Sequence, residues 1–178
     1  MRLTTALLFT ALLANAEILD STAGGFTVRT TLDIKAPPGD VYRKLIHEIG
    51  DWWDPAHTFS GDAHNLRIED RPGGCMCEKL PNDGFSRHLE VITMAPGKQI
   101  VLAGAIGPMQ TVAATGSLQI QFTPADGGTK LEITYAVTGY LPKGMNTWAA
   151  PLDMVLGQQF TRLKSYVETG HAAPAASK

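Results

Sequence analysis

The chain has 178 residues and a formal net charge of −2 at pH 7, from 15 basic and 17 acidic side chains. It has no basic stripe, which argues against nucleic acid or an anionic membrane surface as its main partner. At 44% hydrophobic residues and this length, one domain with its own core is expected.

Residues 1–16 have the pattern of a secretory signal peptide. Arg2 supplies a positive charge, an apolar stretch runs from Leu3 to Leu13, and Ala14-Asn15-Ala16 forms a small-x-small cleavage site. The apolar stretch is shorter than a membrane-spanning helix requires, and no cysteine follows the cleavage site to carry a lipid. We therefore expect an exported, periplasmic protein with no membrane anchor.

After a short N-terminal extension, residues 17–25, the first expected element is a strand. Apolar side chains alternate with polar ones from Phe26 to Ile34, which is typical of a strand with one buried face. Pro37-Pro38-Gly39-Asp40 then precedes apolar residues at helical spacing from Val41 to Ile49. This pattern predicts one or two short helices.

Trp52 and Trp53 stand side by side in a chain with only three tryptophans. Adjacent residues cannot share a face of a strand or helix, so one indole is expected in the core while the other faces elsewhere. Alternatively, both rings pack under a loop, because aromatic side chains serve packing more often than recognition.

The rest of the chain predicts strands and then one long helix. Short strands separated by Gly/Pro turns are expected at 66–71, 75–80, 88–94 and 99–103, and a hairpin at 118–137 around Asp126-Gly127-Gly128. An apolar stripe from Leu152 to Val167 predicts a helix that stops at Gly170, followed by a disordered tail, residues 171–178. The expected fold is α+β, with about seven antiparallel strands curved around the C-terminal helix.

In this order the elements resemble the SRPBCC superfamily, which includes START domains, birch-pollen allergens, polyketide cyclases and Aha-type activators of heat-shock ATPases. The resemblance rests on IKAPPGDVYRKL, DWWDP, RPGG, LEVITMAPGKQIVL, GGTKLEITY and RLKSYVE, within a domain expected at residues 26–170. It implies a helix-grip fold with a cavity for lipids, sterols, polyketides or other apolar ligands. No cofactor is expected.

Glu78 is the acidic residue of most interest. In similar proteins this position faces the cavity, where burial would raise the pKa of the carboxyl and let it bind a ligand hydroxyl or act as an acid or base. The alternative is an outward, salt-bridged Glu78, because buried carboxylates are rare. Glu78 and His88 are the catalytic candidates. The ligand-binding candidates are Trp52, Trp53, Met76, Glu78, Tyr135, Tyr140, Trp148, Leu152 and Leu156.

Cys75 and Cys77 are two apart in an expected strand, so both side chains point to one face. In one register Cys77 opposes His88 and Cys75 opposes Glu90, which gathers four potential zinc ligands. A one-residue shift scatters them and leaves two small residues on the polar outer face of the sheet. A disulfide between residues i and i+2 of one strand would be strained, so reduced thiols or pairing elsewhere are expected.

Two irregular segments are also of note. His57, Asp62 and His64 lie in one loop that could hold a cation, although nothing fixes their spacing and a solvated loop is favoured. The stretch GAIGPMQ, residues 104–110, lacks the spacing of a phosphate loop and is interpreted as a flexible connection or flap over the cavity.

The sequence favours a protein that binds a small apolar or amphipathic molecule, lipid-like or polyketide-like, because no convincing catalytic set accompanies the expected pocket. The first alternative is an enzyme of the polyketide cyclase or hydratase type with Glu78 or His88 as acid or base. The second is a protein-interaction role like that of the heat-shock ATPase activators, against which export argues.

The signal-peptide prediction has a direct test. The exported chain is expected to begin at Glu17, because the Ala-Asn-Ala pattern places cleavage after Ala16. Intact-mass analysis of the periplasmic fraction measures this end, and a retained Met1 would contradict export by this route.

Overall fold

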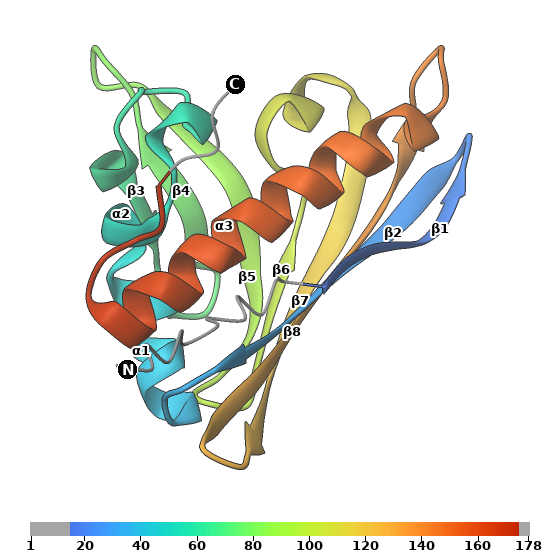
Figure 1. Cartoon of the computed structure of the whole chain (residues 1–178). Coiled ribbons are helices and arrows are strands. Elements are labelled where there is room, and N and C mark those ends of the chain that lie inside the picture. Colours follow the sequence, from blue (N-terminus) through green and yellow to red (C-terminus); the bar gives the residue numbers. More distant parts are fainter. Residues whose placement is uncertain (1–14, 175–178) are drawn as a thin grey trace, which may run out of the picture.

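An antiparallel sheet and one long helix dominate the structure, a computed structural model that describes residues 15–174 (Figure 1). Its elements in chain order are β1 (Asn15–Thr22), β2 (Gly25–Ile34), α1 (Pro38–His47), α2 (Ile49–Trp52), η1 (Pro55–His57), η2 (Ala63–Asn65), β3 (Leu66–Ile68), β4 (Cys75–Lys79), β5 (Phe85–Ala95), β6 (Gln99–Ala103), η3 (Gly107–Thr111), β7 (Ala113–Ala125), β8 (Gly128–Tyr140), η4 (Met145–Trp148) and α3 (Ala149–Thr169). The η elements are short 3-10 helices. Most of the expected signal peptide, residues 1–14, and the end of the expected tail, residues 175–178, lie outside the described residues.

The α+β helix-grip fold expected from the sequence is confirmed, with eight strands rather than about seven. They follow the order β1-β2-β8-β7-β6-β5-β4-β3, and every neighbouring pair is antiparallel. The additional strand is β1, which occupies most of the segment interpreted as an extension. It pairs with the edge of β2, and the Glu17 carboxylate accepts a hydrogen bond from Arg29 at 2.7 Å. Strand formation here depends on the partner edge, because the segment has little alternation of its own.

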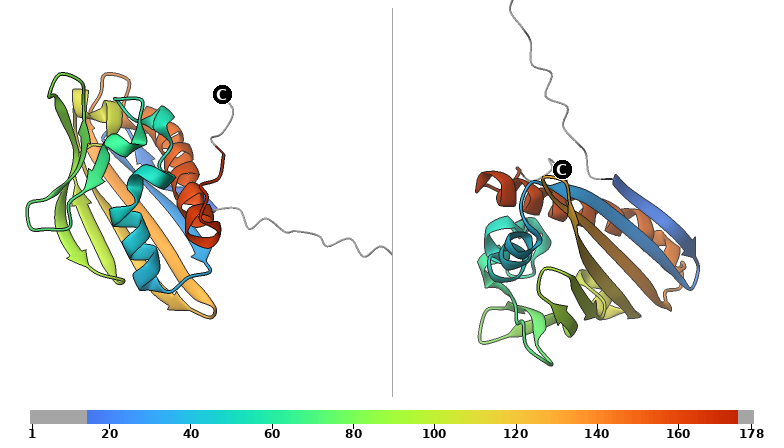
Figure 2. Two further views of the ribbon diagram at one scale, coloured as in Figure 1. Left: turned by 90° about the vertical axis from the view of Figure 1, so that its left-hand side faces the viewer. Right: turned by 90° about the horizontal axis from the view of Figure 1, so that it is seen from below.

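Helix α3 buries its apolar stripe against the concave face of the sheet. Leu156, Phe160 and Leu163 are at most 3% exposed. Helices α1 and α2 lie on the same side of the sheet as α3 (Figure 2). Helix α3 is capped at its C-terminal end by Gly170, whose φ of +80° is a left-handed conformation that favours glycine. The Gly170 N–H donates to the Tyr166 carbonyl at 2.9 Å.

A β-bulge interrupts the pairing of β4 with β5. Cys75 lies opposite Glu90, as predicted in one register, whereas Cys77 lies opposite Arg87 instead of His88. His88 is therefore the extra residue, and the bulge turns its side chain toward the buried face. Among residues 15–174, no helix has both the length and the apolar character needed to cross a membrane.

The packing of α3 predicts a contrast between two substitutions on that helix. Leu163→Ala is expected to lower the free energy of unfolding by about 2–5 kcal/mol, because Leu163 is 0% exposed and its removal leaves a cavity. Met154→Ala is the matched control on the outer side, where the side chain is 57% exposed and the expected change is within about 0.5 kcal/mol. Urea unfolding followed by far-UV circular dichroism measures both. Equal losses in the two variants would contradict this packing.

Candidate functional site

A cavity of about 350 Å³ lies beside the N-terminal part of α3. Its other walls come from the loop 53–59, from β5 and from the segment 106–109 at η3. The walls are mainly apolar and aromatic, and their larger side chains are Trp53, Phe59, Ile106, Met109, Trp148, Leu152, Val155 and Leu156. This volume is within the usual range of small-molecule sites, about 300–1,000 Å³.

Both adjacent tryptophans are buried, Trp52 at 1% and Trp53 at 6% exposed, but only Trp53 also lines the cavity. Trp52 is 1% exposed and packs in the core, with its ring centroid 6.0 Å from that of Phe160. Trp53 lines the cavity, meets Trp52 edge-on at 5.5 Å, and donates from its indole N–H to the His57 carbonyl at 3.1 Å. The pair therefore links the core to the wall of the site.

Only some of the predicted ligand contacts reach the cavity. Trp53, Trp148, Leu152 and Leu156 line it, together with the catalytic candidate His88.

The other predicted contacts lie elsewhere. Trp52 and Met76 are core residues, and Tyr140 is 71% exposed at the end of β8, away from the cavity lining. Glu78 is fully buried and is absent from the cavity lining, so it contacts a cavity residue, His88, rather than the cavity itself.

Tyr135 also has a role other than lining the cavity. It is completely buried, donates from its hydroxyl to the Gly104 carbonyl at 2.7 Å, and accepts from the Ile106 N–H at 3.1 Å. Burial raises the pKa of Tyr135 to about 12, despite the opposing hydrogen bond from Ile106. The neutral phenol thus fixes the start of the 104–110 segment, which closes one side of the cavity.

Glu78 faces inward, so the outward salt-bridged alternative is wrong. Its carboxylate accepts hydrogen bonds from the backbone N–H of Phe59 at 3.1 Å, from the backbone N–H of Ser60, and from Nε2 of His88 at 2.8 Å. One carboxylate therefore ties β4 to both the loop after η1 and the bulge of β5.

The expected rise in the pKa of Glu78 is not found. Burial alone raises the pKa, but hydrogen bonds from Ser60, Phe59 and His88 outweigh it, and the pKa lies below its ordinary value of 4.5. These donors could not be recognised from the residue pattern, because two of them are backbone N–H groups of an irregular loop. Glu78 is thus an ionised anchor at neutral pH, a state that does not suit a general acid.

His88 continues the hydrogen-bond network toward the surface. Its Nδ1 accepts from the Gln110 amide at 3.1 Å, and the Gln110 carbonyl oxygen accepts from the Ser86 hydroxyl at 3.0 Å. Because the Glu78 carboxylate can only accept, the proton of this arrangement sits on Nε2 of His88. Both ring nitrogens are therefore engaged, and the cavity meets the ring itself.

Phe59 covers the histidine ring at the cavity wall. The two ring centroids are 5.3 Å apart with a 34° tilt, and Phe59 is 48% exposed. The sequence does not single out Phe59, Met109 or Gln110, because Phe59 lies in a loop and the other two in a short 3-10 helix, where no periodicity marks a buried face. The interpretation of residues 104–110 as a flap was the one available signal, and Met109 and Gln110 belong to that segment.

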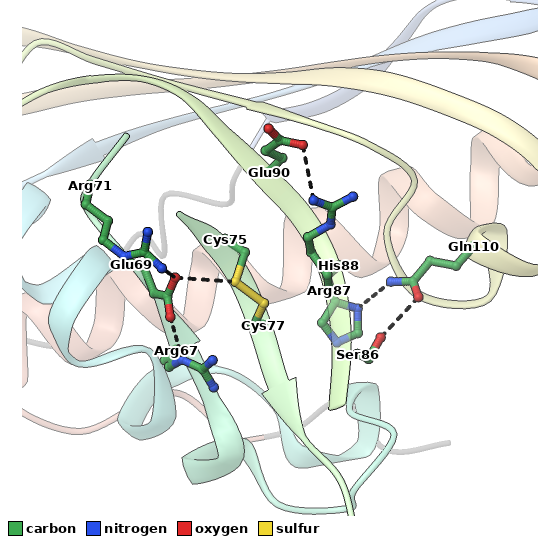
Figure 3. Close-up of a disulfide and its surroundings, with 10 residues drawn as sticks. All are labelled: Arg67, Glu69, Arg71, Cys75, Cys77, Ser86, Arg87, His88, Glu90 and Gln110. Carbon is green, nitrogen blue, oxygen red and sulfur yellow. Dashed lines mark hydrogen bonds and ion pairs between the residues drawn. A yellow bond between two sulfur atoms is a disulfide. The ribbon is translucent and has the colours of Figure 1, made fainter. Parts of the chain in front are cut away.

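The register that would gather the four potential zinc ligands is not the one that the structure has. Cys75 and Cys77 are joined in a disulfide, with their Cα atoms 5.4 Å apart, on the outer side of β4 (Figure 3). The bulge turns His88 to the inner side, so the four side chains never gather on one face. Within residues 15–174, no group of His, Cys, Asp and Glu side chains is arranged to hold a metal ion.

The expectation of reduced thiols is wrong as well. In a regular strand, residues i and i+2 are roughly 6.6 Å apart, near the upper limit for a disulfide. Between Cys75 and Cys77 the Cα separation is 5.4 Å, shorter than in a regular strand and in the usual range for a disulfide.

The His57, Asp62 and His64 side chains do not converge. His57 borders the cavity, whereas His64 is exposed and contacts Asp62 at 3.1 Å and Asp51 at 3.6 Å. The Asp62 carboxylate also caps η2 by accepting a hydrogen bond from the His64 backbone N–H. This bond and the contact with the His64 ring lower the pKa of Asp62. The loop is therefore a solvated one, as favoured.

Comparison with known proteins identifies the fold but no family. No family profile and no curated protein matches the chain. Among solved structures, a conserved protein of unknown function from Enterococcus faecalis is 18% identical with a TM-score of 0.62, over 89% of this chain and 80% of that one. A protein from Rhizobium leguminosarum is 20% identical with a TM-score of 0.57, over 87% and 97% of the two chains.

A further structure is that of DynU16, a protein in the dynemicin biosynthetic locus. It is 16% identical to this chain with a TM-score of 0.56, and the match covers 82% of this chain and 48% of that one. At these identities the similarity establishes the shared α+β architecture alone.

The anchoring role of Glu78 predicts a pH-dependent stability difference. Glu78→Gln is expected to lose roughly 2–4 kcal/mol of unfolding free energy at pH 7, because the charge-assisted hydrogen bonds are lost. Since folding lowers the pKa of Glu78, its contribution is complete above the ordinary value of 4.5 and disappears as the pH falls through the lowered value.

The measurement is urea unfolding of wild type and variant between neutral and acidic pH. The difference in unfolding free energy between wild type and variant is expected to disappear on acidification. Glu90→Gln is the matched control, because Glu90 is partly exposed and pairs at the surface with Arg87 at 3.3 Å. A difference in unfolding free energy that stays constant with pH would show that the ionised Glu78 carboxylate does not stabilise the fold.

Proposed function

We propose that the protein binds a small, mainly apolar molecule in the cavity beside α3, and that it is an exported member of the SRPBCC superfamily. The observation that carries this proposal is the cavity itself, about 350 Å³ with apolar and aromatic walls and a buried polar network at His88. An apolar cavity with a few fixed polar groups suits binding by burial, with orientation supplied by the polar groups.

The lining favours a compact ring-containing ligand over a long acyl chain. Trp53, Phe59 and Trp148 provide aromatic surfaces, and the His88 ring lies against Phe59 at the cavity wall. Flat aromatic walls stack well on planar ligands, while a cavity of this size is short for an extended lipid tail. Of the two ligand classes expected from the sequence, we therefore favour the polyketide-like one.

An enzyme remains the second candidate because Glu78 and His88 form a buried carboxylate–imidazole pair at 2.8 Å. Such a pair can orient an imidazole as a general base. In the present arrangement, Gln110 occupies Nδ1, the nitrogen that a substrate would need. Catalysis would require Gln110 to move away, whereas binding needs no rearrangement, so we favour binding.

The ligand can be sought by native mass spectrometry of protein isolated from the exported fraction. Incubation of the purified protein with the identified compound then separates the two candidates. A compound that is released unchanged in mass supports binding, and conversion that is lost in His88→Gln supports the enzyme. A cavity that retains no small molecule and binds none from the cell extract would contradict both.

The cavity also predicts how tryptophan fluorescence responds to a ligand. Titration with the co-purified compound, or with 8-anilinonaphthalene-1-sulfonate as a probe, is expected to shift the emission to the blue as the ligand replaces water in the cavity that Trp53 and Trp148 line. Trp53→Phe and Trp148→Phe should each reduce the shift and weaken binding by roughly 1–3 kcal/mol.

Trp52→Phe is the matched control. Its indole lies in the core, so this variant should lose stability while keeping most of the shift. An unchanged emission spectrum on titration with a confirmed ligand, or a shift carried by Trp52, would contradict the assignment of the cavity as the binding site.

A further inference from the structure

The Cys75–Cys77 disulfide is poorly placed to act as a structural crosslink. It closes a loop of only three residues, and the stabilisation that a disulfide gives through the unfolded chain grows with loop length. Strand β4 is also paired on both sides, with β3 and with β5. The fold therefore gains little stability from this disulfide.

The charges around the two sulfur atoms are asymmetric (Figure 3). Cys77 has Arg67 directly opposite on β3 and Arg87 directly opposite on β5. Cys75 instead has Glu90 opposite on β5, and its Sγ lies 3.7 Å from the Glu69 carboxylate. Positive neighbours stabilise a thiolate and negative ones destabilise it, so a thiolate is favoured at Cys77 over Cys75.

The charged groups cited around the disulfide form two separate sets of ion pairs. Glu69 accepts from Arg67 at 3.0 Å and from Arg71 at 2.7 Å, while Arg87 and Glu90 pair at 3.3 Å. These ion pairs moderate the asymmetry without removing it, because the arginines remain the cross-strand neighbours of Cys77.

We propose that Cys75–Cys77 is a redox site that exchanges with a soluble thiol, with Cys75 as the attacked sulfur and Cys77 as the leaving thiolate. The incoming thiolate forms a bond to Sγ of Cys75, and the electron pair of the broken S–S bond goes to Sγ of Cys77. The product is a mixed disulfide on Cys75 and a thiolate beside Arg67 and Arg87.

A second thiol molecule completes the reaction. The thiolate of this second molecule attacks the sulfur that the first thiol contributed to the mixed disulfide. This releases Cys75 as a thiolate, which takes a proton from water. Two thiols are then oxidised to one disulfide, and the protein disulfide is reduced to two cysteines. The reverse reaction reoxidises the protein.

Access to the site requires side-chain motion alone. Cys75 and Cys77 are 8% and 4% exposed, but the surrounding arginine side chains are more than half exposed, Arg67 at 55%, Arg71 at 64% and Arg87 at 61%. Exposed side chains change rotamer on the picosecond-to-nanosecond scale. A thiol can thus reach Cys75 while the sheet stays folded. The site lies on the side of β4 away from the cavity and is independent of the proposed ligand.

The first test compares rates of reduction by glutathione, measured by acid quench and mass spectrometry. Reduction of the folded protein should be no more than about threefold slower than reduction of the urea-unfolded chain, with circular dichroism unchanged throughout. A larger slowing, or reduction that occurs only on unfolding, would overturn the proposal, because an inert structural disulfide behaves in that way.

The second test concerns direction. Fragment mass spectrometry of the early mixed disulfide should find glutathione on Cys75, and the double variant Arg67→Gln/Arg87→Gln should be reduced at least about threefold more slowly than wild type. Lys130→Gln on β8, which is separated from β4 by three strands, is the control for loss of a positive charge far from the disulfide and should leave the rate unchanged. Glutathione on Cys77, or equal slowing in both variants, would overturn the assignment of roles.

Discussion

The buried carboxylate of Glu78 is the interaction on which the candidate site depends. A charge at 0% exposure is costly unless donors surround it, and the donors here come from two other parts of the chain. Phe59 and Ser60 bring the loop after η1, and His88 brings the bulge of β5. Satisfying one charge therefore positions both the polar wall of the cavity and the aromatic ring that covers it.

The cavity itself follows from packing a straight helix on a curved sheet. Helix α3 contacts β1 and β2, at one edge of the sheet, while the strands toward the other edge turn away from it. The space between α3 and these strands is filled partly by α1 and α2 and partly by loops. What remains of it is the cavity beside Trp148 and Leu152. Irregular segments form much of its lining, which is usual for sites carried by a rigid scaffold.

The bulge on β5 serves both faces of the sheet. On the inner face it turns His88 toward Glu78, and on the outer face it brings Arg87 opposite Cys77. Without the extra residue, His88 would lie opposite Cys77 on the outer face and the hydrogen-bond network would be lost. A single inserted residue thus separates a buried polar network from an exposed charged surface that contains the disulfide.

The sequence by itself determined the elements whose pattern is periodic. Alternation from Phe26 to Ile34 and the stripe from Leu152 to Val167 fixed a half-buried strand and an amphipathic helix, because burial of one face imposes that spacing. Only the tertiary structure decided the bulge at His88, the disulfide and the donors to Glu78. These depend on which strand residues face each other and on backbone N–H groups of loops, and neither leaves a periodic trace in the sequence.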